Sequence, residues 1–100
     1  MSTYDPTTPL LITPEGEITV FHPEGKTFNL KELQAAVGGM IEVYPMPHVV
    51  QEGRKIKRIM VMNEEGRLRD LPKNAMASAV FGSDGHIVGT VVVCPSRMLR

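Results

Sequence analysis

The stretch Phe28-Asn-Leu-Lys-Glu-Leu-Gln-Ala-Ala-Val-Gly-Gly39 holds all the signals of a short α-helix. The side-chain oxygen of Asn29 can cap the first turn, and Glu32 stands where it closes a capping box. Apolar side chains recur on one helical face, and the paired glycines permit the left-handed conformation that stops a helix. The sequence therefore predicts a helix over residues 30–37, held by packing because so short a helix is marginal alone.

Short apolar runs rich in β-branched residues lie on both sides of this helix and predict strands. Residues 10–13 and 17–21, separated by a Pro-Glu-Gly break, predict an N-terminal hairpin. Further strands are expected over residues 40–44, 56–62 and 87–93.

A second helix is expected over residues 75–81, and either Asp70 or Asn74 can cap it. Its predicted end is the polar, glycine-containing stretch 82–85. Between the third and fourth predicted strands, Glu52-Gly53 is expected to form a turn.

From residue 17 onward, the predicted order is strand, helix, strand, strand, helix, strand. This is the split βαβ pattern of ferredoxin-like domains, preceded here by an extra N-terminal strand. We therefore expect an α+β fold, a small sheet with two helices on one face. A swapped second helix, or a pair of β-rich lobes, fits the same elements. The expected organisation is a flexible arm over residues 1–9, a single domain over 10–95 and a tail over 96–100.

Composition excludes several classes of protein. The chain has 100 residues, and its eleven basic and eleven acidic side chains cancel. Zero net charge argues against a general nucleic-acid binder and against an acidic mimic of DNA. The single cysteine cannot form an internal disulfide, and no apolar run approaches the roughly 18 residues of a membrane span. We expect a cytoplasmic protein with no membrane partner.

Three stretches, in this order, resemble one known family: Leu33-Gln-Ala-Ala-Val-Gly-Gly-Met-Ile-Glu42, then Met62-Asn-Glu-Glu-Gly66 with Leu71-Pro-Lys-Asn74, then Ile87-Val-Gly-Thr-Val-Val-Val93. The chain resembles the domain-of-unknown-function family 3846. The resemblance implies an origin in a bacteriophage or another mobile element, and hence a viral protein in the host cytoplasm. It implies no activity, and Thr90 stands where the family typically has an acidic residue.

The residues that could carry catalysis are scattered. His22, His48 and His86 each lie in a predicted turn, and none has a second ligand at metal-binding spacing. Cys94 fits a small core residue better than a nucleophile. We expect no catalytic residue, no metal and no cofactor, although an enzyme with dispersed site residues stays open.

A cluster of cations offers a first candidate binding site. Four stand within five residues: Arg54, Lys55, Lys57 and Arg58. On one continuous strand, alternation divides them between two faces. The charges of the cluster then either keep an edge strand from pairing with another chain or contact an anionic ligand. The chain has five aromatic residues and no tryptophan, so specific nucleic-acid recognition is not expected.

The proline-rich apolar segment Tyr44-Pro-Met-Pro-His-Val-Val50 offers a second candidate site. If exposed, such a segment marks a contact surface, and the alternative is ordinary packing beneath a loop. Asn63 and Asn74, two polar residues that flank the predicted strands and helix, complete the candidate set. The candidate binding residues are Tyr44, Met46, His48, Arg54, Lys55, Arg58, Asn63 and Asn74.

These observations favour a small non-enzymatic interaction protein that binds a host protein, of the host-takeover or defence-antagonist type. The alternative is a small-ligand binder that sequesters a nucleotide-like signal at a groove or between protomers, using the cationic cluster, Asn63 and Asn74. We also expect a homo-oligomer, most simply a homodimer. The strand over residues 56–62 is apolar on both faces, and two helices on one face would leave the other uncovered.

Overall fold

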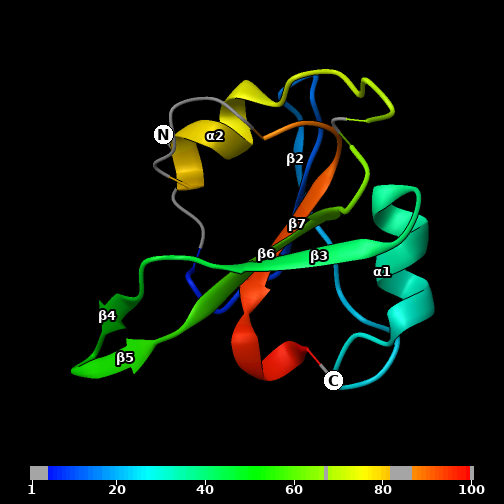
Figure 1. The fold of residues 1–100 in the computed structure, drawn as a ribbon. Coiled ribbons are helices and arrows are strands. Elements are labelled where there is room, and N and C mark those ends of the chain that lie inside the picture. Colours follow the sequence, from blue (N-terminus) through cyan, green and yellow to red (C-terminus); the bar gives the residue numbers. More distant parts are fainter. Residues whose placement is uncertain (1–4, 67, 82–86, 100) are drawn as a thin grey trace.

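A five-stranded antiparallel sheet with strand order β2-β1-β7-β6-β3 forms the centre of the protein, and β4 and β5 form a separate two-stranded sheet (Figure 1). The computed structural model describes residues 5–66, 68–81 and 87–99. The strands are β1 (Leu10–Ile12), β2 (Ile18–Val20), β3 (Ile41–Pro45), β4 (Val49–Gln51), β5 (Arg54–Ile56), β6 (Arg58–Asn63) and β7 (Val91–Pro95). The helices are α1 (Leu30–Val37), α2 (Ala75–Phe81) and the short 3₁₀ helix η1 (Ser96–Met98). In these ranges, no helix has the length and apolar character needed to cross a membrane.

Helix α1 has the predicted bounds because both of its ends are specified locally. The Asn29 side chain accepts a hydrogen bond from Glu32 N at 2.8 Å, and the Glu32 carboxylate accepts one from Asn29 N at 2.8 Å. At the other end, Gly38 adopts a left-handed φ of 82° and donates its N–H to Gln34 O. The predicted capping box and glycine stop are both confirmed.

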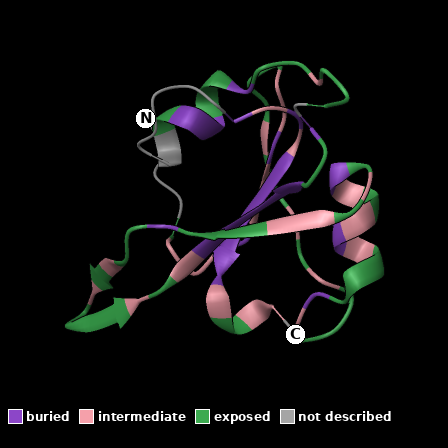
Figure 2. Ribbon diagram, viewed as in Figure 1, coloured by how far each residue is buried: buried purple, intermediate pink, exposed green. Residues whose placement is uncertain are grey.

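The two helices cover opposite faces of the sheet, so the prediction of two helices on one face is wrong. Leu33 and Val37 of α1 pack with Val61 and Val92. Ala77 of α2 belongs to the other core, which contains the neighbouring Met60, Met62, Val91 and Val93. Because successive strand residues point to opposite faces, a strand with apolar residues at every position needs cover on both sides. Figure 2 shows the resulting buried band along β6 and β7.

The α+β class is confirmed, but the sheet order differs from the ferredoxin-like one. In that order β2 would pair with β6 and β7 would lie at an edge. Instead β7 pairs with both β1 and β6. All five residues of β7 are buried, whereas β2 is half-buried at Ile18 and exposed at Thr19 and Val20. Burial of the most apolar strand at the centre therefore decides the order.

The segment predicted as one strand over residues 56–62 is divided at Lys57. Arg54–Ile56 pairs with β4 as a hairpin, and Arg58–Asn63 pairs within the central sheet. The predicted turn at Glu52-Gly53 is confirmed, and both residues have positive φ (51° and 76°), as a tight two-residue hairpin turn requires. This hairpin projects from the body of the protein (Figure 1).

The last strand begins at Val91, later than predicted, because Gly89 has a positive φ of 76° and turns the chain. Asn74 rather than Asp70 caps α2, by accepting a hydrogen bond from Ala77 N at 2.9 Å. The predicted helix end at 82–85 and His86 lie outside the described residues.

Described residues of the predicted arm and tail contact the domain. Asp5 accepts a hydrogen bond from the Gln51 side chain of β4 at 3.0 Å, and Pro9 is buried. At the other end, Met98 O accepts a hydrogen bond from Phe28 N at 2.8 Å.

Candidate binding site

Four of the predicted binding residues line one hollow of about 350 Å³ beside the hairpin. They are Met46, His48, Lys55 and Arg58, and the remaining lining residues are Pro45, Pro47, Lys57, Ile59 and Ser96. We call this the proline hollow, because Pro45 at the end of β3 and Pro47 in the connection to β4 both line it.

The break at Lys57 brings the cations of this hollow together. Lys57 O accepts a hydrogen bond from Ser96 N at 2.8 Å, and Arg58 O accepts one from Met46 N at 2.9 Å. These bonds hold the chain where it leaves the hairpin and enters the central sheet. Lys55, Lys57 and Arg58, which span this break, all line the hollow.

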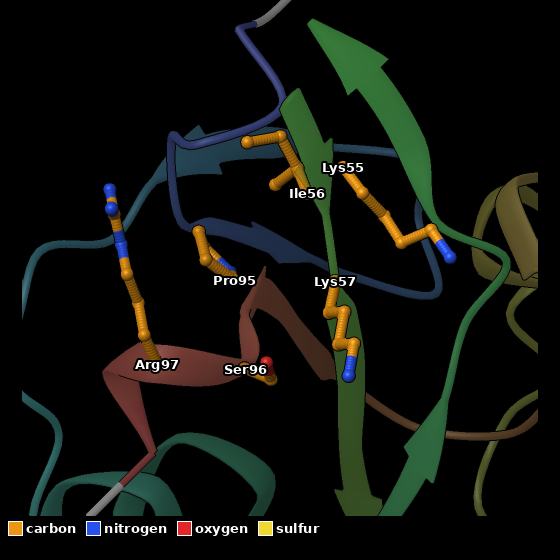
Figure 3. Close-up of a pocket in the computed structure, with 6 residues that line it drawn as sticks. All are labelled: Lys55, Ile56, Lys57, Pro95, Ser96 and Arg97. Carbon is orange, nitrogen blue, oxygen red and sulfur yellow. The ribbon is translucent and has the colours of Figure 1, made fainter. Parts of the chain in front are cut away.

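A second hollow of about 330 Å³ lies against the first and shares Lys55, Lys57 and Ser96 with it. Ile56, Pro95 and Arg97 complete its lining. In Figure 3, the side chains of Lys55 and Lys57 extend to one side of β5, and Arg97 rises from η1 on the other. Arg97 therefore belongs to a different wall from the two lysines.

Among the residues that the structure describes, the lining of the proline hollow is cationic and holds no carboxylate. Its lining includes Lys55, Lys57 and Arg58 but no Asp or Glu. Among the described residues, these three side chains form no ion pair. Arg58 is partly buried, and its Nε is buried with no hydrogen-bond partner in the described part of the chain.

Asn63 and Asn74 lie away from both hollows, where their amides serve the fold. Asn63 Nδ2 donates to Val37 O at 3.1 Å, and Asn63 Oδ1 accepts from Glu65 N at 2.8 Å. Asn74 Nδ2 donates to the carbonyl oxygens of Ile12 and Gly89, while its Oδ1 caps α2.

The other two predicted binding residues are exposed but line neither hollow. The Tyr44 hydroxyl on β3 donates to the Glu42 carboxylate at 3.0 Å, and Arg54 lies at the hairpin turn. The Tyr44–Val50 segment is itself divided: Met46 is buried in the core on the α2 face, and Val50 is 68% exposed.

The described side chains that could carry chemistry are dispersed. Cys94 is buried on the α1 face, and burial raises the pKa of its thiol to about 11. A thiol with so high a pKa is a poor nucleophile at neutral pH. No three His, Cys, Asp or Glu side chains of the described residues lie together as metal ligands would.

Comparison with known proteins places the chain in a family. The model of the family described as Domain of unknown function (DUF3846) matches residues 8–97. The chain belongs to this family. No curated protein and no solved structure matches it.

In this DUF3846 member, the set of candidate binding residues chosen from the sequence omitted two polar residues of the proline hollow. Lys57 was named in the cation cluster but was not chosen as a binding residue. Ser96 was assigned to the tail, and only its bond to Lys57 O places it at the hollow. The family match extends to residue 97, beyond Ser96, and in the sequence itself nothing marks this residue as part of a site.

Proposed function

We propose that this chain is a small non-enzymatic phage or mobile-element protein that acts by binding a host protein. The observation that carries the proposal is the open outer edge of β3, which is the last strand of the central sheet and pairs only with β6 among the described strands. An open edge with exposed apolar side chains is a template for an extended segment of a partner.

The register determines which backbone groups this edge presents. Met46 N donates to Arg58 O, so the even-numbered residues of β3 direct their backbone groups toward β6. The odd-numbered Ile41 and Val43 therefore direct theirs toward the open edge. Pro45 has no N–H, which limits the paired length of a docked strand.

The side chains at this edge favour an apolar partner segment. Met40 is 55% exposed, Val43 37% and Tyr44 39%. The hairpin extends from the same strand and presents Val50, which is 68% exposed. A partner strand that pairs with Val43 would shield this apolar surface from water while its main chain provides most of the affinity.

A proline substitution separates edge pairing from other modes of binding. Val43→Pro removes an outward N–H and leaves the hydrogen bonds to β6 in place, whereas Val43→Thr keeps the N–H and the β-branched shape. Tagged wild type and both variants are used to capture proteins from the host bacterium, and the affinity of any captured protein is then measured with purified components. Circular dichroism checks that each variant is folded.

We expect wild type and Val43→Thr to bind the same host protein, and Val43→Pro to lose it. Equal binding by Val43→Pro would contradict the proposal, as would capture of no host protein. If wild type captures a second copy of this chain and Val43→Pro does not, the edge serves self-association instead. The alternative expectation was a nucleotide-like ligand held by the cations together with Asn63 and Asn74. Those two side chains are not free to bind such a ligand, because their amides are hydrogen-bonded within the fold.

A further inference from the structure

Among the described residues, the lining of the proline hollow includes three cationic residues and no carboxylate. Lys55 and Lys57 extend to the same side of β5 (Figure 3), and Arg58 of β6 also lines the hollow. Charges of one sign repel each other, and a low-dielectric wall strengthens the field that they produce. A concave surface of this kind attracts an anion that carries more than one negative charge.

Arg58 adds a second, independent observation. Its Nε is buried without a hydrogen-bond partner among the described residues, and the side chain as a whole is only partly exposed. A guanidinium nitrogen that is removed from water normally donates to a carboxylate or another acceptor, because an unpaired polar group is costly to desolvate. An anion seated in the hollow that Arg58 lines would provide the missing counter-charge, and a guanidinium matches phosphate oxygens in geometry.

Apart from His48 and Ser96, the remaining lining of the hollow is apolar. Pro45, Met46, Pro47 and Ile59 line it, and the two prolines fix the backbone of the wall. Its volume of about 350 Å³ lies in the range of small-molecule sites. A ligand that fits both walls has phosphate charge at one end and an apolar or planar body at the other.

We infer that the proline hollow binds a small phosphate-bearing molecule, with its phosphate groups on Lys55, Lys57 and Arg58 and its apolar body against Pro45 and Pro47. This site does not depend on the β3 edge, so it stands whether or not a host protein binds there. Phosphate groups also occur in nucleic acids, and the experiment therefore includes DNA as a separate probe.

Titrations of the intact chain with four probes test the inference: ADP, pyrophosphate, adenosine and a short DNA duplex. Affinities are measured by calorimetry at a fixed, near-physiological salt concentration, and amide chemical shifts in NMR spectra locate the binding. We expect ADP to bind at least about ten-fold more tightly than adenosine, since the cations supply most of the attraction, and more tightly than pyrophosphate, since the apolar wall contributes too. Shift changes should centre on residues 45–48, 55–58 and 96.

A charge-matched pair of variants tests the residues. Lys55→Gln with Lys57→Gln removes two charges from the hollow, and Lys26→Gln with Lys31→Gln removes two exposed charges near α1. Both pairs give the same net charge, and the four lysines are exposed, so both variants are expected to fold. We expect the first pair to weaken ADP binding at least about ten-fold and the second to change it by less than about two-fold.

Four results of the affinity measurements would overturn the inference. They are no ADP binding at about millimolar concentration, equal affinity for ADP and adenosine, equal loss in the two charge-matched variants, and DNA binding that is tighter than ADP binding and falls steeply with salt. The last result would assign the cations to a nucleic-acid backbone. Wild-type shift changes confined to residues outside the hollow would also contradict it.

Discussion

At the scale of single residues, the side chain of Asn74 joins three segments of the fold by hydrogen bonds. It is fully buried, and its side chain bonds to three segments: the start of α2, the β1 strand at Ile12 and the turn at Gly89. All its amide hydrogen-bonding groups are paired, so the side chain holds the α2 face of the sheet together. The stability of the fold is therefore sensitive to any substitution of Asn74 that removes a side-chain donor.

We expect Asn74→Asp to lower the free energy of unfolding by about 3 kcal/mol, because a carboxylate cannot donate to Ile12 O and Gly89 O. Asn63→Asp is the matched control. Asn63 Nδ2 makes one such bond, to Val37 O, and its loss should be about half as large. Urea denaturation measures both. Equal effects of the two substitutions would contradict the role given to Asn74.

Because Cys94 is buried, we expect the stability of the fold to depend on pH in the alkaline range. Burial raises the pKa of its thiol from 9.0 to about 11, so the folded state holds this proton more tightly than the unfolded state does. The corresponding stability is fully present below about pH 9 and is lost as the pH rises toward about 11. The difference of about two pH units corresponds to at most about 2.7 kcal/mol.

Other groups also titrate at high pH, so Cys94→Ala is the control. We expect the unfolding free energy of wild type to fall more steeply between about pH 9 and about pH 11 than that of Cys94→Ala, and the native thiol to resist alkylation at about pH 8. Parallel pH profiles of the two proteins, or rapid alkylation of the native protein, would show that Cys94 ionises freely.

At the scale of elements, α1 depends on its cap. Asn29→Ala removes the acceptor for Glu32 N and should lower the free energy of unfolding by about 1 kcal/mol. The Glu32 carboxylate also accepts from Glu24 N at 2.7 Å, so the cap fixes the preceding loop as well. Lys31→Ala, at an exposed position of the same helix, should change stability by less than about 0.5 kcal/mol. A similar result for both variants in thermal denaturation would argue against the cap.

The same helix shows what a sequence can predict. Its cap, its face and its stop are all set by residues within twelve positions, and its bounds agree with the prediction. The break at Lys57 could not be predicted this way, because Ile56 and Ile59 suit one long strand equally well. It is set by long-range contacts, the bonds of Lys57 O to Ser96 and of Arg58 O to Met46.

Prediction of the candidate site depended on the strand break at Lys57. Lys55 and Arg58 were identified from the density of positive charge, but their arrangement around one hollow required the chain to leave the hairpin at Lys57. Asn63 and Asn74 were chosen for their polar side chains. Their burial became visible only once the strands and helices that surround them were placed.

At the scale of the whole molecule, each helix covers one face of the central sheet, and the hairpin projects beyond it (Figure 2). The homo-oligomer expected from the sequence stays a prediction, but its reason changes. The two apolar faces of β6 and β7 are covered within one chain, so they no longer need a second copy. One surface that could pair with a second copy is the open β3 edge, where Ile41 and Val43 present an outward N–H before Pro45.

An edge so short gives a weak dimer. Two copies paired through β3 would bury far less than the roughly 1,200 Å² of a specific interface. We therefore expect light scattering to give the mass of one chain, 11.0 kDa, at about 10 μM and a rising average mass only toward about 1 mM. Val43→Pro should abolish the rise, because it removes an outward donor of the edge, and Val43→Thr should retain it. A stable mass of two chains at about 10 μM, unchanged in Val43→Pro, would require an interface on another face of the molecule.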